Sequence, residues 1–226
     1  MLWSIFAGLL LTLAAHIVAR LLGQRFPKLP VVVISVGLVM LSLWLLRWPY
    51  AAYFQSVGEI FNHLLGYVTV ALAIPLAAMR FDNLPLKRLG NLLLLATFTG
   101  AALPVGLAWL LHLSEPTVQA FATRAVTTPI ALNIASLIDA PLALVSIIVI
   151  VSGLIGAAMS PLLLRNVHDE RAVGLALGLA AHAIGTVEAW QRSPVAGRYA
   201  AFGMAVNGVM TAIWLPIMFY LLGWMD

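Results

Sequence analysis

The sequence has no cysteine and few charged residues. Its 226 residues include 12 lysines and arginines and 8 aspartates and glutamates, so 9% of the chain is charged. The missing thiols exclude disulfides, cysteine-ligated metal sites and a thiol nucleophile. Soluble domains carry about a quarter of their residues as charged side chains. A chain that is 63% hydrophobic, with a mean hydropathy of +1.04, is instead expected in a membrane.

Long apolar runs dominate what the sequence does contain, and they extend well beyond the length of a β-strand. A hydrocarbon core about 30 Å thick takes roughly 20 helical residues per crossing. We therefore predict an all-α integral membrane protein with six to eight transmembrane helices, forming a single domain over residues 1–226. The expected spans lie near residues 3–20, 31–46, 59–79, 89–112, 142–164 and 198–223. The first run lacks a preceding basic region, which favours a retained span over a signal peptide.

Two further segments, residues 117–138 and 172–191, are apolar enough to lie in the membrane but contain polar residues and helix breakers. The first contains Arg124, Thr127, Thr128, Pro129 and Asn133, and the second contains His182, Gly185, Thr186 and Glu188. These two segments are the candidates for broken or re-entrant helices.

Basic residues in short loops mark the cytoplasmic side of a membrane protein. The loops after the first and third expected spans hold three bases each, whereas the loop after the second holds only Arg47. The N-terminus is therefore expected outside. If both unusual segments cross the membrane, 8 of the loop bases lie inside and 3 lie outside. If both segments instead enter from opposite faces and return, 10 loop bases lie inside and 1 lies outside. The count favours two re-entrant segments, with eight full spans as the alternative.

A short pattern recurs after each unusual segment. Val151-Ser152-Gly153 is followed by Ala157 and Pro161, and Val206-Asn207-Gly208 is followed by Ala212 and Pro216 at the same spacing. One interpretation is that residues 117–226 hold two units, each a re-entrant segment and a helix, which run antiparallel as the inverted repeats of secondary transporters do. The alternative is a chance match, because the composition is strongly biased.

Two charges lie inside the unusual segments, Arg124 and Glu188. An ionisable group at membrane depth costs about 2.5 to 3.5 kcal/mol on insertion scales and is usually functional. One interpretation gives Arg124 a structural role, as a residue reaching for lipid headgroups or in a salt bridge with Glu188 or Asp139. The other gives it an anionic substrate, held together with the hydroxyls of Thr127 and Thr128.

Helix breakers accompany these polar residues. Pro129 removes a backbone donor and is expected to leave a half-helix whose N-terminal N–H groups attract anions. Gly185 can break the second segment in the same way. His182 either takes a proton or balances a carboxylate, or it is a hydrogen-bonded structural residue.

Small and polar residues recur every four positions along the expected helices. For Ser152, Gly156, Ser160, Gly174 and Gly178 we expect close helix packing. His182, Thr186 and Asn207 follow the same spacing but are also site candidates. In the third span, Pro75 is expected to kink the helix with help from Thr69, or to line the site.

Other functional classes find little support in the sequence. It contains no H-x3-H pattern or acidic cluster, so no metal site or cofactor is expected. It has no nucleophile elbow, so we expect no enzyme. The bases form no patch with interleaved aromatics, so we expect no nucleic-acid partner.

At these same segments the sequence resembles the LrgB/CidB family, bacterial membrane proteins named as antiholin-like and holin-like components. The family is related to the C-terminal half of the plastidic glycolate/glycerate translocator. The matching stretches are residues 68–76 (VTVALAIPL), 124–131 (RAVTTPIA), 181–186 (AHAIGT) and 208–216 (GVMTAIWLP).

The resemblance implies a multi-pass protein of the bacterial cytoplasmic membrane, with broken helices like those of antiporter and bile-acid-type carriers. We therefore predict a secondary transporter of small monocarboxylates such as pyruvate, glycolate and lactate. The alternative is a holin-like or antiholin-like regulator of murein hydrolase export and autolysis. The resemblance also implies a separate LrgA/CidA-type partner, and a homo-oligomer is left open.

The predicted binding residues come from both segments and from the last span. They are Arg124, Thr127, Thr128, Pro129, Asn133, His182, Gly185, Thr186 and Asn207, with Glu188 as a coupling or salt-bridge partner. The family usually has a base where this chain has Glu188, which favours a proton-coupled or cation-balanced site.

Overall fold

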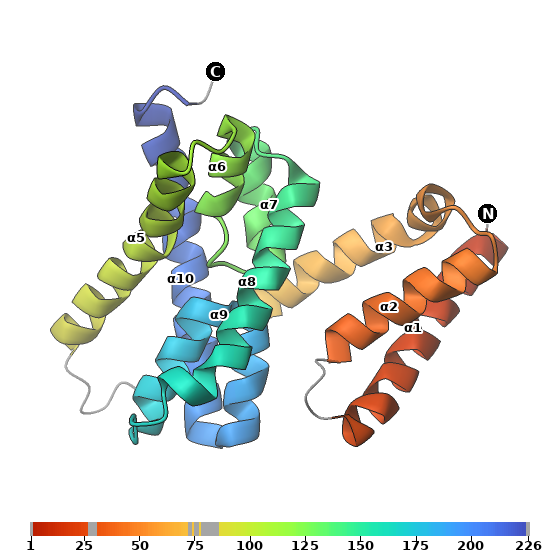
Figure 1. Cartoon of the computed structure of the whole chain (residues 1–226), viewed down its shortest axis with the longest axis horizontal. Coiled ribbons are helices and arrows are strands. Elements are labelled where there is room, and N and C mark those ends of the chain that lie inside the picture. The colour runs from red at the N-terminus through yellow and green to blue at the C-terminus, as the bar shows by residue number, and fades with distance from the viewer. Residues whose placement is uncertain (1, 27–30, 72–73, 75–76, 78–85, 225–226) are drawn as a thin grey trace. The chain divides into compact units, whose positions relative to one another are not determined.

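The computed structural model describes residues 2–26, 31–71, 74, 77 and 86–224 (Figure 1). In these ranges all regular secondary structure is helical, which confirms the predicted all-α class. Five of the described helices are long and apolar enough to cross a membrane, by length and composition. The chain divides into two compact units, Met1–Val68 and Thr69–Asp226.

The first unit contains three helices: α1 (Leu2–Arg25), α2 (Val31–Leu45) and α3 (Tyr50–Ala71). Val57 of α3 is fully buried and faces Gly8 of α1. The hydroxyls of Thr12 and Tyr53 lie 2.7 Å apart and tie the same two helices together. Helix α3 begins nine residues before the span expected at 59–79, because polar residues mark the edge of an apolar run without ending a helix.

Between residues 86 and 224 the second unit contains six helices. They are α5 (Leu86–Leu110), α6 (Glu115–Ala122), α7 (Thr128–Leu137), α8 (Leu142–Leu163), α9 (Glu170–Arg192) and α10 (Pro194–Leu221). Helices α5, α8 and α10 correspond to the spans expected at 89–112, 142–164 and 198–223. One apolar core joins α5, α6, α7, α8 and α10, and its largest fully buried side chains include Ile134, Ile138 and Val145.

The first unusual segment is broken, as predicted. Helices α6 and α7 have 8 and 10 residues, so each rises only about 12 to 15 Å, roughly half of a hydrocarbon core. Ala120 of α6 lies in the same core as Ala131 and Ile134 of α7. Figure 1 shows both helices above the turn that joins them. The start of α6 and the end of α7 therefore lie at the same end of the second unit.

The second unusual segment turns back on itself within α9. The backbone at His182 has φ 40° and ψ −123°, which is not helical. The Nε of Arg192 donates to the Glu170 carboxylate at 3.0 Å, and the hydroxyl of Ser193 donates to it at 2.8 Å. A straight helix of this length would separate its ends by roughly 34 Å. Helix α9 is therefore a hairpin of two half-helices, although it is long enough to span.

The first half of α9 packs closely against α10. A methyl group added at Gly174 would overlap the carbonyl oxygen of Ala196, and one added at Gly178 would overlap that of Ala200. A methyl group added at Gly156 of α8 would lie 2.9 Å from the Cβ of Ala181, a looser but still close contact. The structure therefore confirms the packing interpretation for these three glycines.

We expect Gly178→Ala to destabilise the protein by about 1 to 3 kcal/mol or more, because the new methyl group meets backbone that cannot rotate away. The matched control is Gly106→Ala in α5, where nothing lies within 4 Å of the added carbon and better helix propensity should leave stability equal or slightly higher. Thermal unfolding in detergent measures both, and equal midpoints would contradict the packing argument.

Candidate functional site

The turn between α6 and α7 leads into the N-terminus of α7, where the N-cap residue is buried. Thr127 is the N-cap, with extended φ and ψ of −67° and 148°, and Pro129 is the second helical residue. Proline suits this position because its missing N–H would be unpaired there in any case. Helix α7 therefore begins beside Pro129, where the sequence predicts a half-helix.

The hydroxyl of Thr127 has no hydrogen-bond partner among the described residues, although the residue is only 6% exposed. It makes no capping bond to α7. The first N–H groups of a helix have no intrahelical partner, so the amides of Thr128 and Ile130 lie near a buried hydroxyl that is itself without a partner. Buried polar groups are rarely left unpaired, and this set suits an anion.

Arg124 lies in the same turn and is half-buried. One terminal nitrogen of its guanidinium donates to the hydroxyl of Ser152 on α8 at 3.1 Å. The same side chain lines a cavity of about 380 Å³ between α5 and α6. No ion pair joins Arg124 to Glu188 or Asp139 in the part of the chain that the structure describes. Its charge is therefore available to a ligand.

Asn207 holds the turn in place from α10. Its side-chain amide donates to the carbonyl of Ala125 at 2.7 Å, and the residue is only 2% exposed. Because this bond satisfies a backbone group of the turn, Asn207 positions the site with one N–H of its amide.

His182 forms the break in α9. Its Nε2 lies 3.1 Å from the carbonyl of Val149 on α8, and a carbonyl only accepts, so Nε2 carries the proton. The hydroxyl of Thr186 donates to the carbonyl of His182 at 2.8 Å. Gly185 lies against the carbonyl of Leu177 in the first half of α9. The break thus falls at His182, and Gly185 instead permits the two halves to approach.

Both breaks meet the middle of α8. Arg124 contacts Ser152, and His182 contacts Val149 and packs against Gly153, where an added methyl group would lie 2.5 Å from Cε1 of the imidazole. These α8 residues lie within about one helical turn. Residues from two segments far apart in sequence are therefore brought to one level of the bundle.

The two glycines of the recurring pattern have matching surroundings. Gly153 of α8 faces His182 and Ile184 of the α9 hairpin, and Gly208 of α10 faces Ile130 at the start of α7. Each glycine of the pattern therefore contacts a side chain of the broken segment that precedes the other copy of the pattern. This reciprocal contact involves the residues that the pattern singles out.

Three predicted residues lie away from this cluster or only at its edge. Asn133 is exposed on α7, and Thr128 is half-exposed. Glu188 lines a separate cavity of about 220 Å³ with Ser160 and Arg192, near the ends of α8 and α9. The Thr69 side chain and Pro75 lie outside the described residues.

Some contacts of the site carry no sequence signal of their own. Ser152 belongs to a small-residue stripe, for which we expected packing, yet it is the partner of Arg124. The apolar lining of the Arg124 cavity includes Leu103, Leu107 and Phe121, which are ordinary membrane residues in sequence. Only the packing of α5 on α6 identifies them.

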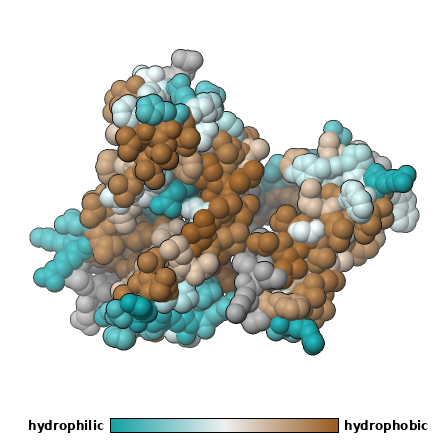
Figure 2. Space-filling model, in the orientation of Figure 1, coloured by the Kyte–Doolittle hydropathy of each residue, from teal (hydrophilic) through white to brown (hydrophobic). Residues whose placement is uncertain are grey.

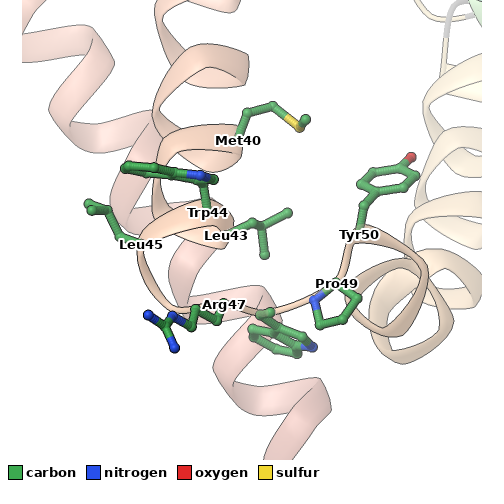
Figure 3. A pocket seen from close by; sticks show the side chains of 8 residues that line it. Met40, Leu43, Trp44, Leu45, Arg47, Pro49 and Tyr50 are labelled. Atoms are coloured by element: carbon green, nitrogen blue, oxygen red, sulfur yellow. The ribbon is translucent and has the colours of Figure 1, made fainter.

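The first unit has its own hollow of about 680 Å³, where α2 turns into α3. Figure 3 shows Met40, Leu43 and Tyr50 facing across it, whereas the guanidinium of Arg47 points away. No predicted site residue lines this hollow. Arg47 is nevertheless among the residues that line it, so the Arg124 cluster differs from this hollow in holding the residues that the sequence predicts.

The fold and the two breaks define a multi-pass helical membrane protein with half-helices that meet inside the bundle. A family model described as the LrgB-like family matches residues 12–221. The chain therefore belongs to the LrgB-like family, which confirms the resemblance seen in the sequence.

Curated relatives cover nearly the whole chain. The uncharacterized protein YwbG of Bacillus subtilis is 32% identical over 221 residues, 93% of this chain and 96% of the relative. An uncharacterized protein of Haemophilus influenzae is 31% identical, over 84% of this chain and 83% of the relative. The holin-like protein CidB of Staphylococcus aureus is 25% identical, over 94% and 95%. No solved structure matches the chain.

We expect Asn207→Leu to cost about 1 to 3 kcal/mol of stability, because it leaves the buried carbonyl of Ala125 without a donor. Asn133→Leu is the matched control: that side chain is exposed, and its loss should change stability by less than about 0.5 kcal/mol. Unfolding titrations in mixed detergent micelles compare the two. Similar losses for both variants would contradict the positioning role.

Proposed function

We propose that this protein is a secondary carrier of small monocarboxylates, such as pyruvate, glycolate and lactate, which bind where α7 begins. The observation that carries the proposal is the unpaired, buried hydroxyl of Thr127 at the start of a half-helix whose turn also holds Arg124. A helix N-terminus attracts anions through its free N–H groups and its dipole. A half-helix that points its N-terminus into the bundle is typical of substrate sites in carriers.

The predicted residues take different parts in this proposal. Arg124 and Thr127 bind the carboxylate with the first amides of α7, and Pro129 keeps that helix start in place. Thr128 adds a second hydroxyl from a half-exposed position. Asn207 positions the turn. Asn133 is left without a role in binding, because its side chain is exposed.

The α9 hairpin is proposed to close the site from the other side. His182 donates to Val149 across the α8 surface that Arg124 also contacts. Gly185 and Thr186 hold the hairpin in this shape. Movement of this hairpin against α8 would open the site, which is the alternating access we propose.

The reciprocal contacts of Gly153 and Gly208 support an inverted repeat, with α6 to α8 as one unit and α9 to α10 as the other. In Figure 1 α6 and α7 extend from the upper end of this bundle down to the turn that joins them, whereas α9 begins at its lower end. Two antiparallel units of this kind are the usual framework for alternating access.

The orientation of the second unit is proposed from its charges. One end of this helix bundle is basic: it holds the bases at the start of α5, at the end of α8 and at both ends of α9. At the other end, the charged residues that flank the described turns are acidic, Glu115 and Asp139. Figure 2 shows hydrophilic residues at the lower end of this unit below a hydrophobic side. By the positive-inside rule the basic end of this unit is cytoplasmic. We propose that the membrane is a bacterial inner membrane. The N-terminus is proposed to lie outside, from the loop charges of the sequence.

Glu188 is proposed as a proton-coupling group on that cytoplasmic side. It is half-buried in its own cavity, and the nearest base on its helix, Arg192, already pairs with Glu170. The Glu188 carboxylate has no ion pair among the described residues, which leaves it available for the coupling role.

A second candidate function is a holin-like role, because relatives that cover the chain are named holin-like protein CidB. In that case the protein would control murein hydrolase export and autolysis, with an LrgA/CidA-type partner or as a homo-oligomer. This function would not require the Arg124 and Thr127 cluster. The two candidates are therefore separable by variants of that cluster.

We expect Arg124→Ala to abolish saturable counterflow of labelled pyruvate, glycolate and lactate in proteoliposomes, because it removes the only described cation of the cluster. Arg165→Ala, which removes an exposed base at the end of α8, is the matched control and should transport at the wild-type rate. Saturable uptake that is unchanged in Arg124→Ala rules out the carboxylate site. Dye release from liposomes that is equal in both variants, without counterflow, favours the holin-like function.

A further inference from the structure

Helix α5 holds a buried hydroxyl that the packing of the bundle does not explain. Thr97 is only 2% exposed, and its hydroxyl has no hydrogen-bond partner among the described residues. A threonine inside a helix can donate to the carbonyl four residues earlier, as Thr99 does to Leu95 at 2.7 Å and Thr186 does to His182 at 2.8 Å. Thr97 makes no such bond, so its hydroxyl remains available to a ligand.

Thr97 lies on the face of α5 that packs against the turn between α6 and α7. A methyl group added at Gly100 would lie 3.3 Å from the Cβ of Ala125 in that turn. Ala101 is buried in the core to which α6 and α7 also contribute. Residues three and four apart share one face of a helix, and such a step rises about 5 Å. Thr97 is therefore about one helical turn from the level of Ala125.

This position is on the side of the turn from which the α9 hairpin approaches. Helix α5 begins at the lower end of the unit in Figure 1, so Thr97 lies nearer to that end than Gly100 does. Helix α9 also begins at the lower end, and its break at His182 forms the tip of its hairpin. Helix α5 contacts α9 as well as α6. Thr97 therefore flanks the region between the two broken segments.

We propose that Thr97 is a further substrate-binding residue, whose hydroxyl donates to the oxygen on carbon 2 of a monocarboxylate held by Arg124 and Thr127. The inference rests on the proposed function and adds a residue that determines its specificity. Pyruvate carries an oxo group on that carbon, and glycolate and lactate carry a hydroxyl there. The carboxylate and the neighbouring oxygen are thus bound from two elements, the turn before α7 and helix α5.

The expected effect follows from the value of one hydrogen bond between neutral groups, which changes affinity about 3- to 10-fold. Lactate and propionate differ only in the hydroxyl on carbon 2, and so do glycolate and acetate. The wild-type protein should bind the hydroxy acid of each pair about 3- to 10-fold more tightly. Thr97→Val replaces the hydroxyl with a methyl group and should remove this preference, whereas Thr97→Ser keeps the hydroxyl and should retain it.

The test is displacement of radiolabelled pyruvate from the purified protein in lipid nanodiscs by the four acids. The quantity compared is the ratio of half-displacing concentrations within each pair. Thr99→Val is the matched control on the same helix, because the Thr99 hydroxyl bonds to its own helix, and its ratios should equal those of the wild type. Without ligand, Thr97→Val should unfold at the wild-type temperature or higher, because no hydrogen bond is lost.

Each outcome separates this inference from the carrier itself. Equal affinities within the pairs for the wild type, or a preference that persists in Thr97→Val, overturn the role of Thr97. A lower unfolding temperature with unchanged ratios also overturns it and indicates a structural hydroxyl. In these cases, pyruvate binding that is lost in Arg124→Ala still supports the carrier. Pyruvate binding that Arg124→Ala leaves unchanged overturns both.

Discussion

The structure depends on one constraint: backbone polar groups freed at membrane depth must find partners inside the protein. Both broken segments free such groups where their helices break. Asn207 satisfies the carbonyl of Ala125, and Thr186 satisfies that of His182. Three buried side-chain groups among the described residues have no partner: the hydroxyls of Thr97 and Thr127 and the indole N–H of Trp214. Of these three, only the Thr127 hydroxyl shares its turn with Arg124 and lies at the start of a half-helix, which is why we propose a ligand there.

Close helix packing is what brings the two breaks to one level. Glycines at Gly174 and Gly178 let the α9 hairpin approach α10 to backbone contact, and Gly153 admits the imidazole of His182 to α8. The Glu170–Arg192 pair closes the hairpin at its other end. The hairpin is thus fixed at both its tip and its ends, so a change of access would have to move it as a body against α8.

The sequence was sufficient for the helical class and for the broken segments, because apolar length and the Thr127-Thr128-Pro129 run have direct local consequences. The loop charges favoured re-entry, and the closed ends of α9 agree with it. The partners of Ser152 and Asn207 could not be predicted, because a four-residue spacing identifies a helix face but not its neighbour. Glu188 and Arg124 are both charges at depth, and only the fold assigns them to separate cavities.

The most direct test of the central claim is an experimental structure of the protein in lipid with 3-bromopropionate, whose bromine is located by anomalous scattering. The account predicts the carboxylate within hydrogen-bond distance of both the Arg124 guanidinium and the Thr127 hydroxyl, at the start of α7, with the bromine next to it. Bromine density elsewhere, or an Arg124 cavity occupied by lipid with no carboxylate bound, would contradict it.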